Sequence, residues 1–190
     1  MTARNVHVVL VGMMGAGKTT VGRRLAKVLG RPFVDADEAF IASTGRTIAE
    51  VFADDGEPAF RALESTLLQR LLAVREPMVV AAGGGVVIAA GNRRRLLQRD
   101  VLVVHLHAEP AFLASRAEAK AHRPLLAAGD TAAVIGRLYD ERQAWYREIA
   151  DLSIDIAPFH EWGSNPKKAM AEHIAQAVLA HESTAEEVDR

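Results

Sequence analysis

The chain has 190 residues, of which 49% are hydrophobic and 25% are charged. This composition is typical of one globular domain spanning 1–190 and excludes a disordered chain. The 23 basic and 24 acidic residues give a formal net charge of -1, which argues against nucleic acid or an anionic membrane as a partner. The chain has no cysteine and therefore no disulfide or thiolate metal ligand. Without an apolar leader or a long uncharged apolar run, we expect a soluble, cytoplasmic protein.

Short apolar runs alternate along the chain with longer segments of helical period. The runs that predict strands are 6–11, 32–34, 78–82, 101–106 and 152–156, and amphipathic helices are predicted at 19–29 and 60–72. Because parallel strands need long crossovers that are usually helical, this order predicts an α/β fold with a mainly parallel five-stranded sheet and helices on both faces. Ligands are then expected at the carboxyl ends of the strands.

A phosphate-binding motif follows the first predicted strand directly. Residues 12–19 read Gly-Met-Met-Gly-Ala-Gly-Lys-Thr, which fits G-x-x-x-x-G-K-[ST], and they open a predicted helix. The glycines let backbone N–H groups wrap phosphate oxygens, Lys18 reaches the β- and γ-phosphates, and the Thr19 hydroxyl ligates Mg²⁺. The chain lacks the N-K-x-D of a GTPase, and its nearest aspartates close a short strand, unlike those of an ATPase motor. Of the classes of protein that use this motif, a kinase that phosphorylates a small molecule remains.

Two carboxylates, Asp35 and Asp37, follow the second predicted strand. Alternate residues of an extended chain point the same way, so both can face the phosphates. One can hold Mg²⁺ while the other orients or deprotonates an attacking hydroxyl. The alternative is a helix N-cap at a solvated strand end.

Further candidates come from two long connecting segments, 35–72 and 108–151, which exceed what a crossover requires. In the first, Arg61 can clamp a carboxylate while Glu64 holds its side chain, although such a pair is often only a surface salt bridge. The triple glycine 83–85 indicates a close backbone approach to a ligand. In the second segment, the charged stretch 116–124 predicts a mobile lid, with a solvated loop as the alternative.

These motifs together resemble the shikimate kinase family from the phosphate-binding loop at 12–19, the P-loop, to about Asp155. They are the P-loop, D-x-D at 35–37, G-E-x-x-F-R-x-x-E at 56–64, G-G-G at 83–85, R-P-L-L at 123–126 and R-x-x-x-Y at 142–146. The resemblance implies the fold of nucleoside monophosphate kinases, with a substrate-binding region at about 35–63 and a lid at about 113–127. It also implies transfer of the γ-phosphate of ATP to the 3-hydroxyl of shikimate, in chorismate and aromatic amino acid biosynthesis.

The same resemblance assigns roles to individual residues. Shikimate is expected to bind Asp37, Arg61, Gly83, Gly84, Gly85 and Arg142; ATP is expected to bind Gly15, Ala16, Gly17, Lys18, Thr19, Thr20, Arg116 and Arg123. Thr19 and Asp35 are expected to serve Mg²⁺, and Lys18, Asp37 and Arg123 to be catalytic. One departure is that 158–166 lacks the basic residue that some members place near the adenine, so the adenine contacts there stay open.

Three further expectations complete the prediction. The polar, acidic tail should fray from about 182 to 190. No interface is evident, which makes a monomer the default. The alternatives to a shikimate kinase are a gluconate-type sugar-acid kinase and a non-catalytic, nucleotide-binding regulatory module on the same fold.

Overall fold

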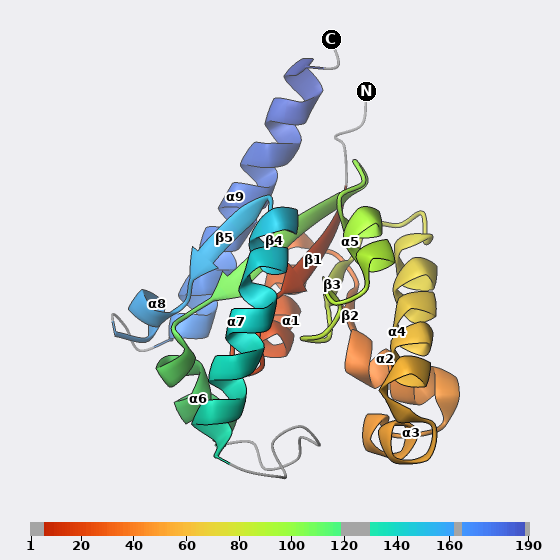
Figure 1. The fold of residues 1–190 in the computed structure, drawn as a ribbon. Coiled ribbons are helices and arrows are strands. Elements are labelled where there is room, and N and C mark those ends of the chain that lie inside the picture. Colours follow the sequence, from red (N-terminus) through yellow and green to blue (C-terminus); the bar gives the residue numbers. More distant parts are fainter. Residues whose placement is uncertain (1–5, 119–129, 162–164, 189–190) are drawn as a thin grey trace.

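The computed structural model of the chain describes residues 6–118, 130–161 and 165–188 (Figure 1). Its strands are β1 (His7–Val11), β2 (Phe33–Asp35), β3 (Val79–Ala81), β4 (Val101–His107) and β5 (Leu152–Asp155). Its helices are α1 (Lys18–Leu29), α2 (Ala36–Thr44), α3 (Ile48–Asp54), α4 (Gly56–Leu72), α5 (Ala90–Leu96), α6 (Pro110–Glu118), α7 (Thr131–Ile149), α8 (Ala157–Glu161) and α9 (Pro166–Val188). None of the described helices combines the length and apolarity that a membrane span requires.

The five strands form one sheet in the order β2-β3-β1-β4-β5, and every neighbouring pair is parallel. This confirms the predicted parallel α/β fold. All five residues of β1 are buried, as expected for a central strand covered on both faces. Because every strand runs the same way, their carboxyl ends meet at one edge, and the start of β1 and the C-terminal end of α9 lie at the opposite end of the molecule (Figure 1).

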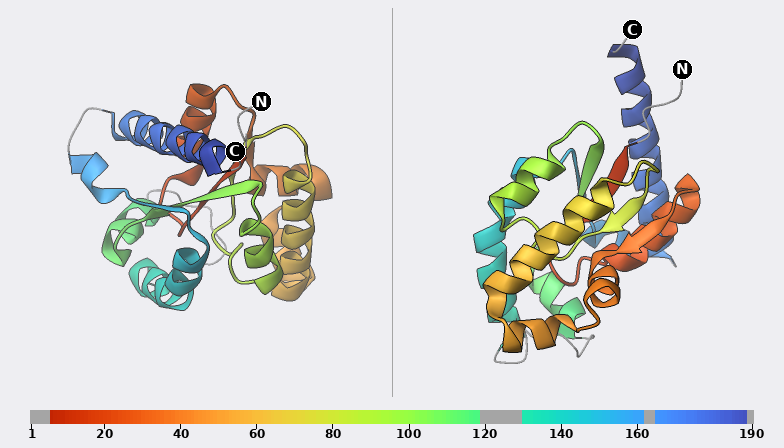
Figure 2. Two further views of the ribbon diagram at one scale, coloured as in Figure 1. Left: turned by 90° about the horizontal axis from the view of Figure 1, so that it is seen from above. Right: turned by 90° about the vertical axis from the view of Figure 1, so that its right-hand side faces the viewer.

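Helices cover both faces of the sheet, so the fold has three layers. Seen from above, α1 and α9 lie on one face, and α5 and α7 on the other (Figure 2). The main core fills the space between the layers with the valines of the strands and leucines such as Leu25, Leu72 and Leu106. Burial of a parallel sheet on both faces explains why its strands read as nearly continuous apolar runs.

The predicted substrate-binding region 35–63 is folded into α2, α3 and the first turns of α4. It has a small core of its own, formed by Phe40, Val51 and Phe60, with the Phe40 and Phe60 rings 5.2 Å apart. Thr47 and Glu50 form a reciprocal capping box at the start of α3. These local signals hold the region together as a helical unit beside the edge of the sheet.

The C-terminal tail differs from the prediction that it frays from about 182. Helix α9 continues to Val188, and Glu182 is only 4% exposed. Its carboxylate accepts two hydrogen bonds of 2.8 Å from the Arg31 guanidinium and one of 3.2 Å from the Val6 N–H. The prediction is therefore wrong at Glu182, because a polar residue near a chain end is here one partner of a buried, long-range ion pair.

Replacing Glu182 by alanine should lower the free energy of unfolding by about 3 kcal/mol, because it leaves Arg31 and the Val6 N–H buried without this carboxylate. The matched control is Glu172→Ala on the same helix. Glu172 makes an exposed ion pair with Lys168, so its loss should cost less than about 1 kcal/mol. Urea unfolding measures both values, and equal losses would contradict a stabilising role for the buried pair.

Candidate active site

A cavity of about 830 Å³ lies at the carboxyl ends of the strands. Most of the predicted site residues line it: Gly15, Gly17, Lys18, Thr19, Thr20, Asp35, Asp37, Arg61, Gly83, Gly84, Gly85, Arg116 and Arg142. Ala16 does not line it, because its side chain is only 1% exposed and belongs to the main core. Arg123 and most of the predicted lid lie outside the described residues. The structure thus brings residues from distant parts of the chain to one place.

The P-loop between β1 and α1 is wound in a way that requires glycine. Gly12, Gly15 and Gly17 have φ values of 138°, 87° and 88°. A Cβ at Gly12 would lie 2.3 Å from the Leu106 carbonyl oxygen, and one at Gly15 would lie 2.6 Å from that of Leu113. Side chains are therefore disfavoured by conformation at all three positions and also by steric overlap at Gly12 and Gly15. A glycine loop wound in this way can present backbone N–H groups to phosphate oxygens.

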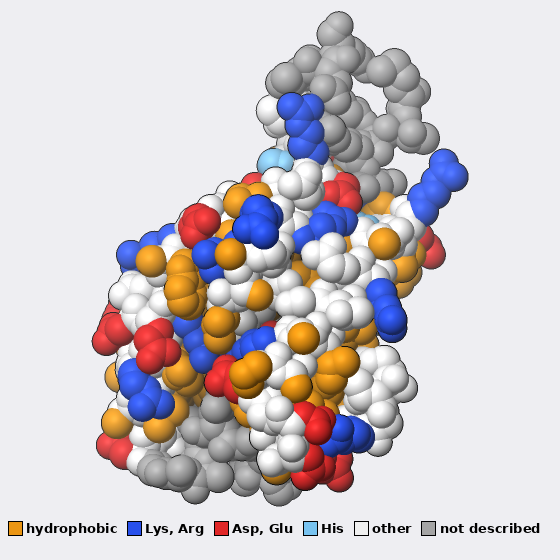
Figure 3. Space-filling view, turned by 45° about the vertical axis from the view of Figure 1, so that its right-hand side comes forward, with side chains coloured by type: hydrophobic (Ala, Val, Ile, Leu, Met, Phe, Trp, Pro, Cys, Tyr) orange, Lys and Arg blue, Asp and Glu red, His pale blue; other side chains and the backbone are white. Residues whose placement is uncertain are grey.

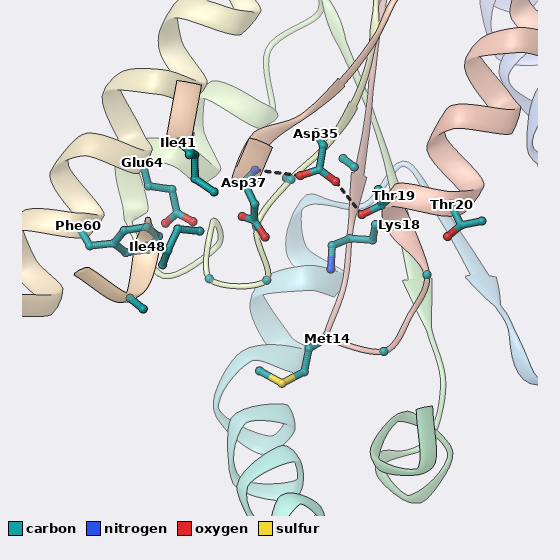
Figure 4. Close-up of a pocket in the computed structure, with 18 of the residues that line it drawn as sticks. Met14, Lys18, Thr19, Thr20, Asp35, Asp37, Ile41, Ile48, Phe60 and Glu64 are labelled. Carbon is teal, nitrogen blue, oxygen red and sulfur yellow. Dashed lines mark hydrogen bonds between the residues drawn. The ribbon is translucent and has the colours of Figure 1, made fainter. Parts of the chain in front are cut away.

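Lys18, the first residue of α1, is held at the mouth of this loop. Its ammonium donates hydrogen bonds to the carbonyl oxygens of Gly12 at 2.8 Å and Met13 at 3.2 Å. In Figure 4 the ammonium points into the cavity between the P-loop and Asp37. A cation in this position can interact with phosphates that the loop binds.

Asp35 is the last residue of β2. Its contacts agree both with a helix N-cap and with a carboxylate near the phosphate site, the two alternatives that the sequence left open. Its carboxylate caps α2 by accepting from the N–H groups of Asp37 and Glu38, and it also accepts a 2.7 Å hydrogen bond from the Thr19 hydroxyl (Figure 4). The Asp35 and Thr19 oxygens are hard ligands at the edge of the P-loop. They suit Mg²⁺, which usually takes one or two protein oxygens together with substrate phosphates.

Asp37 reaches the cavity by a different route from the one predicted. The two carboxylates do not alternate on one strand as predicted, because β2 ends at Asp35 and Asp37 lies in the first turn of α2. Its carboxylate nevertheless points into the cavity, between Lys18 and Glu64 (Figure 4). The capping of α2 by Asp35 therefore sets the direction of the second carboxylate.

Arg61 on α4 is fixed by two carboxylates. Its guanidinium donates to Glu64 at 2.8 Å and to Glu57 at 2.9 Å, and lies 4.9 Å from the centre of the Phe60 ring. Glu64 is buried, and this burial raises the pKa of its carboxyl group, partly offset by the charge of Arg61. With the Arg61 side chain only 14% exposed, the pair is not a surface salt bridge.

The triple glycine after β3 makes room for this pair. A Cβ at Gly85 would lie 2.2 Å from an Arg61 guanidinium nitrogen, and one at Gly83 would lie 2.7 Å from a Glu64 carboxylate oxygen. At these two positions the close approach is made by the protein's own side chains. The sequence correctly indicated an approach to the backbone but not what approaches it.

Arg142 on α7 is 5% exposed, yet it lines the cavity. It donates a 3.3 Å hydrogen bond to the Gly84 carbonyl oxygen, which also accepts from the Tyr146 hydroxyl. Within the described part of the chain, its Nε has no hydrogen-bond partner and no carboxylate lies within 4.0 Å of its guanidinium. A buried cation of this kind favours an anionic ligand.

Tyr146 is in turn supported from the sheet. Its ring stacks on His105 with centroids 5.0 Å apart and an interplanar angle of 16°. Burial lowers the pKa of His105 to about 4, so the imidazole is neutral at pH 7. His105 thus has a packing role near the end of β4.

Arg116 on α6 contacts the P-loop at Gly15. Its Nε donates a 3.0 Å hydrogen bond to the Gly15 carbonyl oxygen, and burial lowers the pKa of its guanidinium. This contact places a cation beside the loop, where the sequence predicted one.

The apolar wall of the cavity and several further lining residues were not predicted from the sequence. The wall is formed by Ile41, Ile48, Ala49, Phe52 and Phe60, and further lining residues are Met14, Thr47, Ser115 and Lys167. Ile41, Ile48 and Phe60 face the cavity beside Glu64 (Figure 4). The spacing of Ile48 and Phe52 on α3 was an available signal, but it also fits ordinary core packing.

On the face shown in Figure 3, basic and acidic side chains are interspersed, in keeping with the small net charge.

The P-loop on a central parallel strand, with a second set of charged groups across the same cavity, defines a P-loop kinase that acts on a small acceptor. Comparison with known proteins gives the family. The sequence model of the family described as shikimate kinase matches residues 14–179. The chain belongs to the shikimate kinase family.

Individual relatives agree with this assignment. A shikimate kinase of Caulobacter vibrioides is 42% identical over 171 residues, which cover 90% of this chain and 81% of the relative. The solved structure of shikimate kinase from Acinetobacter baumannii in complex with shikimate is 35% identical, with a TM-score of 0.83 over 93% of this chain and 94% of that one. A gluconokinase from Sinorhizobium meliloti, 22% identical with a TM-score of 0.50 over 95% of this chain and 99% of that one, shares the fold.

Proposed function

We propose that this chain transfers the γ-phosphate of ATP to the 3-hydroxyl of shikimate, giving shikimate 3-phosphate and ADP in the route to chorismate and the aromatic amino acids. The observation that carries the proposal is Arg142, a buried guanidinium that faces the P-loop cavity without a carboxylate partner in the described structure. Shikimate has one carboxylate and several hydroxyls, and a guanidinium binds a carboxylate in bidentate geometry.

On the nucleotide side, the backbone N–H groups of residues 15–20 bind the phosphates, and Lys18 interacts with the β- and γ-phosphates. Thr19 and Asp35 would hold Mg²⁺, which would neutralise charge on the phosphates. Their 2.7 Å hydrogen bond keeps the two oxygen ligands together at the edge of the loop. Arg116 lies beside the nucleotide, supported by its hydrogen bond to Gly15.

On the acceptor side, Arg61 and Arg142 bind the shikimate carboxylate. Glu57 and Glu64 fix the Arg61 guanidinium, so little conformational freedom remains to be lost on binding. The backbone of Gly83 to Gly85 completes the binding surface, and the apolar wall packs against the ring of the substrate. The ring is then held with its reacting hydroxyl toward the P-loop.

Asp37 lies between the two halves of the cavity and orients the 3-hydroxyl, accepting its proton as the phosphoryl group is transferred. In a loose transition state, positioning and charge neutralisation carry most of the rate enhancement. Arg123, outside the described residues, is proposed to add positive charge at the transferred phosphoryl group. That the chain is a cytoplasmic monomer is likewise a prediction, and sedimentation of the purified chain would check the monomeric state.

Arg142→Gln tests the proposal. It keeps hydrogen-bonding capacity but removes the charge, so KM for shikimate should rise about 100-fold while KM for ATP changes less than about twofold. Arg147→Gln is the matched control, since Arg147 is an exposed arginine on the same helix and should leave both constants unchanged. An unaltered KM for shikimate in Arg142→Gln would contradict the role of this residue in acceptor binding.

A further inference from the structure

Lys167 is the second residue of α9 and lines the same cavity as the P-loop. Of the described residues that line this cavity, it is the only one contributed by α9. Helix α9 packs against α1, the helix that follows the P-loop. It begins at the carboxyl end of the sheet and runs toward the end at which β1 starts (Figure 1).

The position of Lys167 along the axis of α9, compared with the P-loop, follows from the contact between α1 and α9. Arg31, just after α1, contacts Glu182 on α9, and Lys18 lies about 13 residues before Arg31. Since both helices run the same way with the same rise per residue, the position on α9 level with Lys18 is close to residue 169. Helical side chains lean toward the N-terminus, so Lys167 extends past the start of α9 toward the P-loop level.

Lys167 also lies on the buried face of its helix. Met170, Ala171, Ile174 and Val178, at helical spacing from Lys167, are all buried against the core. The neighbouring Lys168 is exposed and pairs with Glu172 at 3.7 Å. Two adjacent lysines therefore have different surroundings: one faces solvent and an acidic partner, and the other faces the cavity.

Lys167 places a positive charge in the first turn of α9, next to a cavity that is expected to bind an anion. The first turn of α9 contains no acidic residue, although a helix N-terminus favours negative charge. The described carboxylates that line the cavity are Asp35, Asp37 and Glu64, all from β2, α2 and α4. The described residues of α6 and α9 that line it include two cations, Arg116 and Lys167, and no acidic residue. An anionic group bound at this end of the cavity would balance them.

We propose that Lys167 is a nucleotide-binding residue that interacts with the phosphate chain of ATP from α9. The inference rests on the proposed function, which places ATP in this cavity. The basic group at this end of the nucleotide site is then supplied by the first turn of α9.

The test compares Lys167→Ala with the wild-type chain and with Lys168→Ala as the matched control. Kd for ATP, measured by calorimetry at low salt, should rise about fivefold in Lys167→Ala and stay unchanged in Lys168→Ala. KM for shikimate should not change. Lys167→Arg should restore most of the affinity, because it keeps the charge. The difference between Lys167→Ala and wild type should shrink between about 0.05 M and about 0.5 M salt, since the contact is electrostatic.

The outcomes separate this inference from the proposed function. If the wild-type chain binds ATP and Lys167→Ala binds it equally well at low salt, Lys167 has no nucleotide contact and the inference is overturned. An affinity loss that Lys167→Arg does not restore, or that is insensitive to salt, indicates a structural effect of the first turn and also overturns it. Absence of ATP binding by the wild-type chain would instead reject the proposed function itself.

Discussion

Lys18→Ala is expected to lower kcat by about 10³-fold, the largest effect of any single substitution in this chain. The ammonium is held at the mouth of the P-loop by the carbonyl oxygens of Gly12 and Met13, 2.8 and 3.2 Å away. From this position it stabilises the negative charge on the transferred phosphoryl group, an interaction that the methyl group of alanine cannot make. Steady-state ADP release with saturating ATP and shikimate measures the effect.

Lys27→Ala is the matched control, since Lys27 is exposed near the other end of the same helix. It should leave kcat within about twofold of the wild-type value, as expected for an exposed surface side chain. Thermal unfolding of both variants separates a loss of catalysis from a loss of structure. A Lys18→Ala protein that folds and retains more than about a tenth of the wild-type kcat would be incompatible with this role for Lys18.

Asp37→Asn should lower kcat by about 10²-fold while the Kd for ATP changes little. Asparagine keeps the size of the side chain but removes the negative charge that orients the acceptor hydroxyl and receives its proton. The residue faces the cavity from the first turn of α2, and the cap of that helix belongs to Asp35, so the substitution leaves the capping carboxylate in place. Single-turnover kinetics together with ATP titration distinguish the two effects.

Glu38→Gln is the control for this experiment. Glu38 follows Asp37 on α2 and pairs with Arg23 at the surface, where both side chains are more than half exposed. The same chemical change there should have no effect on kcat. A near-normal rate in Asp37→Asn would show that the acceptor hydroxyl is positioned by other groups.

The sequence predicted most of the fold because its signals are local. The glycines of the P-loop mark positive φ angles at Gly15 and Gly17, and the apolar runs mark strands covered on both faces. Charged residues at strand ends and in two long segments correctly indicated one cavity, since parallel strands bring their carboxyl ends to a common edge.

The features that the sequence did not predict depend on contacts between distant residues. Glu182 reads as part of a polar tail, and only its distance to Arg31 shows that it is buried. Gly85 reads as a ligand-binding glycine, but the group that excludes a Cβ there is the guanidinium of Arg61. Lys167 reads as one of two similar lysines, and only the packing of α9 on α1 separates it from Lys168.

The most direct test of the proposed function is ADP release from Mg-ATP by the purified chain with shikimate, with gluconate and with no acceptor. Release that depends on shikimate, with gluconate equal to the blank, is the result that the proposal predicts. Release with gluconate but not with shikimate would contradict it and favour a sugar-acid kinase. ATP binding without acceptor-dependent release would also contradict it and favour a regulatory, nucleotide-binding module.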